Sequence, residues 1–375
     1  MKIYIIAGEA SGDLHASNLV KALLVRNPKH EIRGWGGDMM SAAGVQVVKH
    51  YRELAFMGFT EVVMNLRTIL NNLESCKSDI AEWKPDLVIL VDYPGFNLRI
   101  APFAKKIGIP VVYYISPQLW AWKEGRVKII RASVDKMLCI LPFEKAWYKE
   151  RGVEAAYVGH PLLDALEEYP FRSDFRTSNK LDERPIIALL PGSRKQEIKI
   201  KLPIMLDATK QWQADYQLVV AAAPGQTSSF YEPFLKNYGA RLVQGETYDL
   251  LKNAQFAIVT SGTATLETAL IGTPELVVYK GNPISYQIGK RLVKVKYISL
   301  VNLILDHSLL AELIQNDCNP AQIHAELLKL KQPDRLQEIR AGFEKLKSIL
   351  GNAGASARAA HEIETFMQMH LSKSK

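Results

Sequence analysis

The sequence predicts an α/β fold made of two doubly wound domains, each with a parallel sheet between layers of helices. Short uncharged runs such as Leu87–Val91 and Ile186–Leu190 are typical of strands that are buried on both faces. Segments with helical periodicity alternate with these runs, and the alternation begins again after a polar, charged stretch, Glu167–Arg184. At 375 residues the chain is also long for one domain, so two are expected.

The domain limits follow from the polar stretch. The first domain is expected over residues 1–166 and the second over residues 185–350, with the charged connection between them. A last helix, Ser356–Leu371, carries apolar residues on one face. Residues 351–375 are therefore expected to pack back on the body of the protein.

The expected strands share a short apolar core and a glycine, proline or polar residue after it. They lie at Lys2–Ala7, Glu31–Gly37, Val45–Val48, Leu87–Val91, Val111–Ile115, Met137–Leu141 and Ala155–Val158 in the first domain, and at Ile186–Leu190, Leu218–Ala222, Arg241–Val243, Phe256–Val259 and Leu276–Tyr279 in the second.

Composition narrows the class of protein. The formal net charge is +8, with no basic tail or arm, which favours anionic substrates or lipid surfaces over nucleic acid. Cys76, Cys139 and Cys318 lie far apart and form no metal or redox pair, so a reducing, cytoplasmic setting is expected. No run approaches the roughly 20 apolar residues of a membrane span.

The loop Gly8–Asp13 follows the first strand and is rich in small and polar residues. It is not a G-x-G-x-x-G fingerprint and lacks the lysine of a phosphate-binding P-loop. Its glycines would let a substrate approach the backbone, with Glu9, Ser11 and Asp13 as polar contacts. The alternative is an ordinary βα turn in which Asp13 caps the helix, which explains Asp13 but not the other polar residues.

Asp92 comes directly after the buried strand Leu87–Val91, and Pro94 stops that strand. Ligands of open α/β sheets bind outside the carboxyl ends of the strands, which places Asp92 where chemistry is expected. The alternative is an aspartate that only forms a turn.

Large apolar side chains occur at two places outside the expected strands. Trp120 and Trp122 lie in the loop after Val111–Ile115, where they would form a platform for a sugar or an acyl chain, or a hydrophobic lid. Phe56, Met57 and Phe59 precede a long helical segment and suit either the core or contact with a greasy acceptor or membrane surface.

The second domain contains a stretch that is typical of an anion site. Thr260–Thr263 breaks the strand Phe256–Val259, and Ala264–Ile271 is expected to be a helix capped by Ser261 or Thr263. The amides of the turn at Gly262 and of the first helical turn would bind phosphate, and the helix dipole would assist. Glu267, about one turn inside, either accepts hydrogen bonds from a ribose or only complements the dipole; the sequence alone favours neither.

Arg194 follows the strand Ile186–Leu190 beside Gly192 and could bind a diphosphate bidentately. The chain has neither a D-x-D pair nor an H-x-x-x-H spacing. We therefore expect no metal and no other cofactor, and we expect the charge of a leaving diphosphate to be met by Arg194 and a helix N-terminus.

Six motifs together resemble the lipid-A-disaccharide synthase family: GEASGD at Gly8–Asp13, the D-x-P-x-F-N pattern of Asp92–Asn97, SPQLWAW at Ser116–Trp122, LLPGSR at Leu189–Arg194, TSGTATLE at Thr260–Glu267 and SLVN at Ser299–Asn302. They span nearly the whole chain in the family's order. The resemblance implies a GT-B glycosyltransferase of family 19, in which two Rossmann-like domains face a central cleft. Departures from the family's pattern are Val301, where proline is common, and Tyr93 and Gly95, where many relatives have alanine and aspartate.

The resemblance also implies the reaction. Diacylglucosamine passes from UDP-2,3-diacylglucosamine to the 6-hydroxyl of 2,3-diacylglucosamine 1-phosphate, which gives a β-1,6 disaccharide and UDP. The first domain would bind the acceptor and meet the cytoplasmic face of the inner membrane, and the second would bind the nucleotide. A homodimer is an option that the sequence does not decide.

Each candidate residue takes a role in such an inverting displacement. Asp92 is the expected base, and Arg194 with Ser261, Gly262 and Thr263 is the expected clamp on the diphosphate. The other expected contacts are Glu267 and Asn302 with the donor, and Glu9, Ser11, Asp13, Trp120 and Trp122 with the acceptor. The alternatives are a sugar-nucleotide epimerase, another GT-B transferase, or a non-catalytic protein that hands lipid to a partner.

Overall fold

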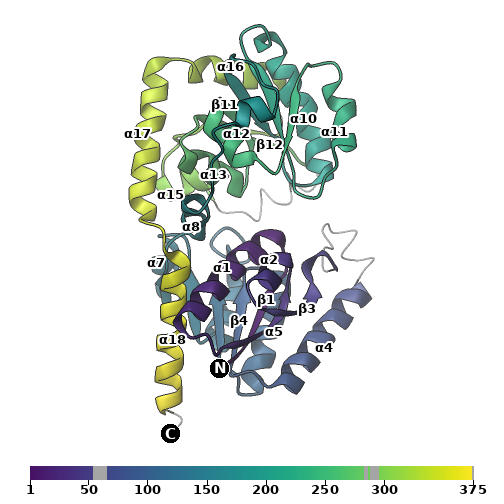
Figure 1. Cartoon of the computed structure of the whole chain (residues 1–375). Coiled ribbons are helices and arrows are strands. Elements are labelled where there is room, and N and C mark those ends of the chain that lie inside the picture. The colour runs from purple at the N-terminus through teal and green to yellow at the C-terminus, as the bar shows by residue number, and fades with distance from the viewer. Residues whose placement is uncertain (54–65, 283–285, 288–294, 374–375) are drawn as a thin grey trace. The chain divides into compact units, whose positions relative to one another are not determined.

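The structure is a computed structural model that describes residues 1–53, 66–282, 286–287 and 295–373 (Figure 1). The chain divides into two compact units, residues 1–164 with 352–375, and residues 165–351. Each unit is described by itself below. The apolar residues Phe56, Met57 and Phe59 lie outside the described residues.

The described residues of the first unit form a parallel sheet with the strand order β3-β2-β1-β4-β5-β6-β7. Its strands are β1 (Lys2–Ala7), β2 (Glu31–Gly36), β3 (Gln46–His50), β4 (Leu87–Val91), β5 (Val111–Tyr114), β6 (Lys136–Cys139) and β7 (Ala155–Tyr157). Its helices are α1 (Ala10–Arg26), α2 (Asp38–Ala42), η1 (Tyr51–Glu53), α4 (Leu66–Trp83), α5 (Pro94–Lys106), η2 (Glu124–Arg126), α6 (Val127–Ser133), α7 (Glu144–Lys149) and α18 (Ala355–Lys373), and α8 (Pro161–Glu167) crosses into the second unit.

The second unit repeats the plan with the order β10-β9-β8-β11-β12-β13. Its described strands are β8 (Ile186–Leu190), β9 (Gln217–Ala222), β10 (Arg241–Gln244), β11 (Ala254–Thr260), β12 (Glu275–Tyr279) and β13 (Glu312–Ile314). Its described helices are α9 (Phe175–Ser178), α10 (Lys195–Thr209), η3 (Lys210–Trp212), α11 (Ser228–Leu235), α12 (Thr247–Asn253), α13 (Thr263–Ile271), α15 (Leu300–Leu305), α16 (Pro320–Leu330) and α17 (Pro333–Leu350).

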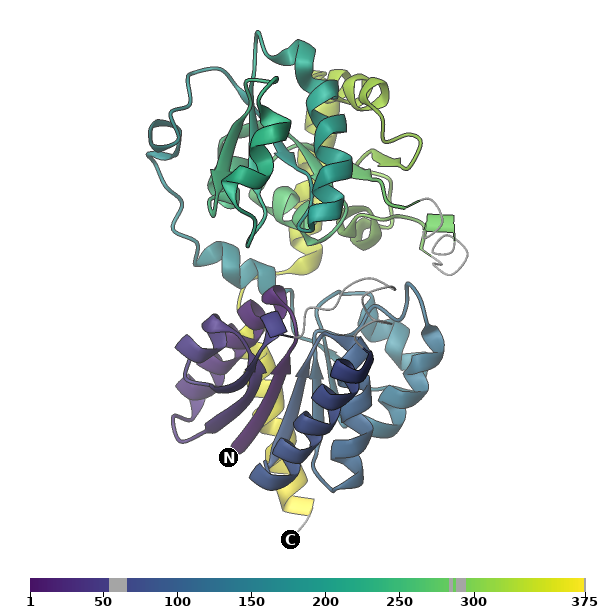
Figure 2. The same cartoon turned by 90° about the vertical axis from the view of Figure 1, so that its right-hand side faces the viewer.

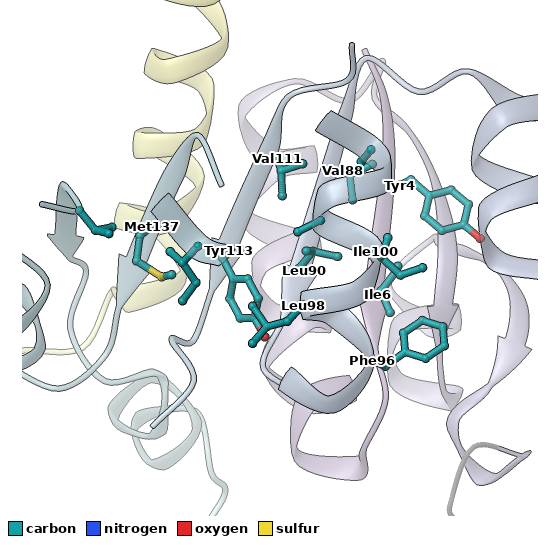
Figure 3. Close-up of a cluster of buried hydrophobic side chains, with 14 of the residues drawn as sticks. Tyr4, Ile6, Val88, Leu90, Phe96, Leu98, Ile100, Val111, Tyr113 and Met137 are labelled. Carbon is teal, nitrogen blue, oxygen red and sulfur yellow. The ribbon is translucent and has the colours of Figure 1, made fainter. Parts of the chain in front are cut away.

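Side chains of the first sheet alternate between two cores, because successive residues of a strand point to opposite faces. Tyr4 and Ile6 of β1 join a cluster with α4, α5 and α6, which Figure 3 shows around Leu90, Leu98 and Tyr113. The neighbouring residues of β1 join a second cluster with α1 and α18 on the other face (Figures 1 and 2). The uncharged runs in the sequence are therefore strands covered on both sides.

The C-terminal helix α18 belongs to the first unit. The Asp164 carboxylate accepts hydrogen bonds from the backbone N–H groups of Gly354, Ala355 and Ser356 at 2.7, 2.9 and 2.9 Å, which satisfies the start of the helix. The helix then buries Ile363 and other apolar residues against α1 and the sheet. This packing explains the apolar stripe near the end of the sequence.

The expected α/β fold and its parallel strands are confirmed, and the strand boundaries agree with the expected ones or differ by one or two residues. The sequence analysis misses β13, whose three residues are too short to show a pattern. The expected cap of α13 is wrong. Gly262, with φ of 155°, is the N-cap and no side chain caps it, because the Ser261 hydroxyl donates to the carbonyl of Ile298 at 2.8 Å.

Glu275 is an unusual core residue at the start of β12. It is fully buried, and neither carboxylate oxygen has a hydrogen-bond partner among the described residues. Burial raises the pKa of Glu275 well above its ordinary value, so folding favours the protonated form. The wild-type protein is therefore expected to lose stability as the pH rises above about 4.3, the ordinary pKa of glutamate.

Glu275→Met should remove this loss because methionine fills similar space without a polar group. We expect the variant to unfold at higher urea concentration than the parent at pH 8, by on the order of 1–3 kcal/mol, with a smaller difference at pH 5. Glu344→Met, at an exposed position of α17, serves as the control and should not show this pH dependence. A Glu275→Met variant that is no more stable than the parent at pH 8 would contradict the prediction.

Candidate active site

The first group of candidate residues lies where β1 and β4 end. These strands pair in parallel, with Ala7 opposite Val91, so Glu9 and Asp92 follow neighbouring strand ends. The aromatic ring of Tyr93 covers Gly8, where a Cβ would lie only 2.2 Å from a ring carbon. Glycine is therefore required at position 8, and the two loops pack directly on each other.

The backbone around Asp92 is held in an unusual conformation. Asp92 and Tyr93 both have φ of 46°, in the left-handed region that non-glycine residues rarely adopt. The Asp92 N–H donates to the carbonyl of Tyr114 at 3.1 Å. Its carbonyl accepts from the Tyr113 hydroxyl at 2.6 Å and from the Asn97 amide at 2.7 Å. These bonds fix the direction of the half-buried Asp92 side chain.

The electrostatics of this group suit proton transfer. Burial, together with the negative charges of Glu9 and Glu144, raises the pKa of Asp92 to about 7. A carboxyl group with this pKa is close to half ionised at neutral pH, which is the condition under which a general base works best. Glu9 is half-buried nearby, and Ser11 is exposed in the first turn of α1.

Asp13, expected as an acceptor contact, is buried and already occupied. One of its carboxylate oxygens accepts from the N–H groups of Gly37 and Met40 at 2.7 and 3.1 Å, and the other accepts from Met39 at 3.1 Å. These donors belong to the start of α2. We therefore propose that Asp13 positions the loops at this edge of the sheet instead of touching substrate.

The tryptophan loop after β5 is organised by a residue that the sequence analysis misses. The carboxylate of Glu144, which is 1% exposed, accepts from the Ser116 hydroxyl at 2.6 Å and from the Trp120 indole at 3.1 Å. It also accepts from two backbone N–H groups, and burial raises the pKa of Glu144 to about 7. Trp120 is thereby held as a support for the loop, and Trp122 is left 41% exposed.

In the second unit Arg194 follows β8 as the N-cap of α10. Its side chain is 61% exposed and, among the residues that the structure describes, makes only a long ion pair with Glu197, at 3.8 Å. Gly192, at φ of 117°, allows this turn, because a Cβ there would meet the Glu197 carboxylate at 2.5 Å. The nearly buried Lys201 ammonium lies 3.7 Å from the other oxygen of Glu197. The Arg194 guanidinium is therefore available to an anion.

The turn after β11 lies at the same edge, because β11 pairs with β8. Gly262 and Thr263 are exposed, and the nine-residue helix α13 begins there without a side-chain cap. Its first N–H groups and its dipole favour an anion. Ser261 supports the turn through its bond to Ile298.

Glu267 of α13 has a partner that the sequence analysis does not predict. Its carboxylate accepts a hydrogen bond from the Tyr248 hydroxyl at 2.9 Å, and burial raises the pKa of Glu267. Tyr248 also lines a cavity of about 430 Å³. The walls are Tyr169, Ala222, Ala223, Pro224, Gly225, Gln226, Gln244, Gly245, Thr247 and Tyr248, at the carboxyl ends of β9 and β10.

Asn302, expected as a donor contact, is fully buried. Its amide donates to the Leu310 carbonyl and to the Glu312 carboxylate, both at 2.9 Å, and accepts from the Leu310 N–H at 2.8 Å. Glu312 also accepts from the N–H groups of Ile298 and Ser299. We propose that Asn302 and Glu312 hold the segment that supports Ser261.

No group of three or more histidine, cysteine, aspartate or glutamate side chains in the described ranges could hold a metal ion. The three cysteines are buried and free. Among the helices that the structure describes, none is long and apolar enough to cross a membrane.

Solved structures with a similar architecture include a glycosyltransferase and a protein in complex with UDP. The S. aureus MnaA structure with UDP superposes with a TM-score of 0.68 at 14% identity, over 98% of this chain and 97% of that chain. The glycosyltransferase of kitacinnamycin gives a TM-score of 0.64 at 13% identity, over 98% and 99%. These similarities show the two-domain α/β fold of GT-B glycosyltransferases and related epimerases.

Proteins with similar sequences identify the family of this chain. The profile of the family described as Lipid-A-disaccharide synthetase matches residues 3–362. The lipid-A-disaccharide synthase of Syntrophus aciditrophicus is 44% identical over 367 residues, with 96% of each chain covered. That of Myxococcus xanthus is 40% identical over 369 residues, again with 96% of each covered. This chain belongs to the lipid-A-disaccharide synthase family, whose members are glycosyltransferases that make the lipid A disaccharide.

Proposed function

We propose that this chain catalyses the inverting transfer of 2,3-diacylglucosamine from UDP to the 6-hydroxyl of 2,3-diacylglucosamine 1-phosphate. The products are the β-1,6-linked disaccharide 1-phosphate and UDP. The main structural support for this reaction is Asp92. Its backbone is fixed at a strand end by hydrogen bonds, and burial and nearby negative charges raise the pKa of its carboxyl group to about 7.

The second unit takes the donor in this proposal. Arg194 and the N-terminus of α13 meet the diphosphate, since both follow adjacent strands and lack strong partners of their own. Glu267, held by Tyr248, accepts hydrogen bonds from the ribose. The cavity beside Tyr248 has largely apolar walls and can admit a planar nucleobase, so we assign it to the uracil of the donor.

The first unit takes the acceptor. Asp92 accepts the proton of the 6-hydroxyl while that oxygen attacks C1 of the donor sugar. The bond between C1 and the diphosphate oxygen breaks, UDP leaves, and a single direct displacement inverts C1. Glu9 and Ser11 contact the acceptor sugar, and Trp122 lies against its apolar parts, supported by Trp120.

An assay of UDP release with purified protein and both lipid substrates tests this function. Release is expected only when the donor and the acceptor are both present, with one disaccharide formed per UDP. UDP release or sugar epimerisation with the donor alone would instead indicate an epimerase or hydrolase. Binding of both lipids without UDP release would indicate a non-catalytic lipid carrier.

We also propose that the protein acts in the cytoplasm on the inner-membrane surface. Support comes from the exposed Trp122 and the net charge of +8, and from the diacylated substrates themselves. Buried aromatic side chains and nearby cations each contribute on the order of 1–3 kcal/mol to membrane binding.

Flotation with anionic vesicles should therefore show reversible association that salt weakens but does not abolish. Phe56→Ser with Phe59→Ser should reduce the association, and Val25→Ser, at an exposed apolar residue of α1, is the control. No flotation at low salt, or flotation that the double variant leaves unaltered, would contradict the assignment of these residues to the membrane.

A further inference from the structure

The segment between β5 and α6 is tied down at several points. The Tyr148 hydroxyl donates to the carbonyl of Pro117 at 3.3 Å, and Glu144 binds Ser116 and Trp120. The Trp120 ring also packs edge-on against Phe143, with centroids 5.0 Å apart. These contacts hold the part of the loop that precedes residues 122–126 in place.

This segment lies close to Asp92. β4 and β5 are neighbours, and the Asp92 N–H donates to the carbonyl of Tyr114. The Tyr113 hydroxyl donates to the Asp92 carbonyl at 2.6 Å. Burial and Asp92 raise the pKa of this hydroxyl, and the charge of Arg126 acts in the opposite direction. Arg126 lies at the other end of the loop that follows β5, where η2 ends and α6 begins.

Two cations of the segment have no anionic partner among the described residues. Neither Lys123 nor Arg126 forms an ion pair or a side-chain hydrogen bond with any residue that the structure describes. Glu124, between them, instead pairs with Arg151 at 2.8 Å. The Lys123 ammonium lies over the Trp122 ring, 4.2 Å from its centroid. The Arg126 N–H donates to the carbonyl of Lys123 at 3.0 Å, so the two residues are neighbours. Burial and the like charge of Arg126 lower the pKa of Lys123.

We propose that Arg126 and Lys123 bind the phosphate on C1 of the acceptor sugar, with Trp122 beneath Lys123 as the wall of this subsite. The proposal rests on the proposed function, because it concerns the acceptor of that reaction. A phosphate monoester is a dianion with several acceptor oxygens, which an arginine can bind through two N–H groups and a lysine as a point charge. It supplies the negative charge that two adjacent cations lack.

The geometry of the acceptor agrees with this placement. In a glucosamine ring the phosphate-bearing C1 and the C5 that carries the 6-hydroxymethyl group flank the same ring oxygen. With the 6-hydroxyl at Asp92, the phosphate therefore lies about one sugar ring away, on the same side of the molecule. Arg126 is half-buried at the end of the loop that follows β5, and β5 pairs with the strand that ends at Asp92, so the subsite would set which acceptor hydroxyl faces the base.

The test pairs variants with two acceptors, 2,3-diacylglucosamine 1-phosphate and the same lipid without phosphate, in neutral detergent micelles. Arg126→Ala should lower kcat/KM for the phosphorylated acceptor by roughly 10- to 100-fold, and Lys123→Ala by less, with the KM for donor unchanged. With the acceptor that lacks phosphate, the variants and the parent should react alike. Arg126→Lys should recover part of the loss.

Lys128→Ala is the matched control, because Lys128 is an exposed cation in the first turn of α6, two residues after Arg126. An equal loss with both acceptors would show that Arg126 only supports the loop, and no loss with the phosphorylated acceptor would also overturn the proposal. A loss that appears only after anionic phospholipid is added would assign the cations to a lipid headgroup.

Failure of the proposed function is separable from failure of this subsite. If the parent chain turns over neither acceptor, equilibrium binding of the phosphorylated lipid to the parent and to Arg126→Ala still decides the question. The subsite is supported if the parent binds the phosphorylated lipid more tightly than Arg126→Ala does and the two proteins bind the dephosphorylated lipid equally. Equal binding of the two proteins contradicts it.

Discussion

Asp92→Asn is expected to lower kcat by about 10²–10⁴-fold while donor binding stays nearly unaltered, because asparagine keeps the shape of the side chain but cannot take a proton. Asparagine is also suited to the left-handed backbone at this position, where φ is 46°. The variant therefore removes the proton acceptor with little disturbance of the loop. An alanine at position 92 would add backbone strain and confuse the result.

The pH dependence provides a second measurement. A base with a pKa of about 7 is protonated and inactive below that pH, so kcat/KM of the parent should rise as the pH increases through about 7. Asp92→Asn should lose this acidic limb. Glu9→Gln should move the limb to lower pH, because the charge of Glu9 helps to raise the pKa of Asp92.

Two results would remove Asp92 from the role of base. One is an Asp92→Asn protein that retains most of its kcat while Glu9→Gln does not, which would assign the base to the loop after β1. The other is an acidic limb that persists in Asp92→Asn, since Glu144 has a similar pKa. Buried Glu144 would then control activity through the tryptophan loop.

Arg194→Ala is expected to lower kcat by roughly 10²–10³-fold, the effect of removing one preorganised charged donor from a developing anion. The guanidinium is largely exposed and only weakly paired with Glu197, so its removal leaves no buried charge behind. The variant should fold normally. Arg194→Lys should recover only part of the rate, because a lysine cannot form two parallel hydrogen bonds with the diphosphate.

Lys195→Ala is the matched control, since Lys195 is the next residue, is also exposed and carries the same charge. It should retain nearly full activity at physiological salt. A folded Arg194→Ala protein with unchanged turnover would exclude Arg194 from the mechanism. Loss of UDP affinity without loss of kcat would show that Arg194 binds the donor but does not stabilise the transition state.

Some polar residues in the motifs have structural roles, which their sequence pattern does not reveal. Asp13 and Asn302 lie in motifs as polar as the one that contains Asp92, yet each is buried and occupied by backbone or side-chain partners. Their partners, α2 and β13, come from other parts of the chain. A single sequence shows that a residue is polar, but only packing shows which of its atoms are already bonded.

Other residues are important in the structure although nothing in the sequence marks them. Glu144 and Tyr248 lie in or beside ordinary helical segments, and their chemistry comes from contacts with Trp120 and Glu267. No spacing rule links such pairs. Signals that could have pointed to them are weak, a glutamate after Pro142-Phe143 and a tyrosine at the start of a helix.

The sequence alone determined the two α/β domains, most of the strands and the loops to which we assign the chemistry. Uncharged β-branched runs are stable only when both faces are covered, and the polar residues directly after them must then lie at one edge of a sheet. Asp92, Arg194 and the turn at Gly262 could be located in this way. The tertiary structure decided the rest. Burial and the charges of Glu9 and Glu144 set the pKa of Asp92, and hydrogen bonds occupy Asp13 and Asn302. Among the described residues, none gives Arg126 or Lys123 an anionic partner.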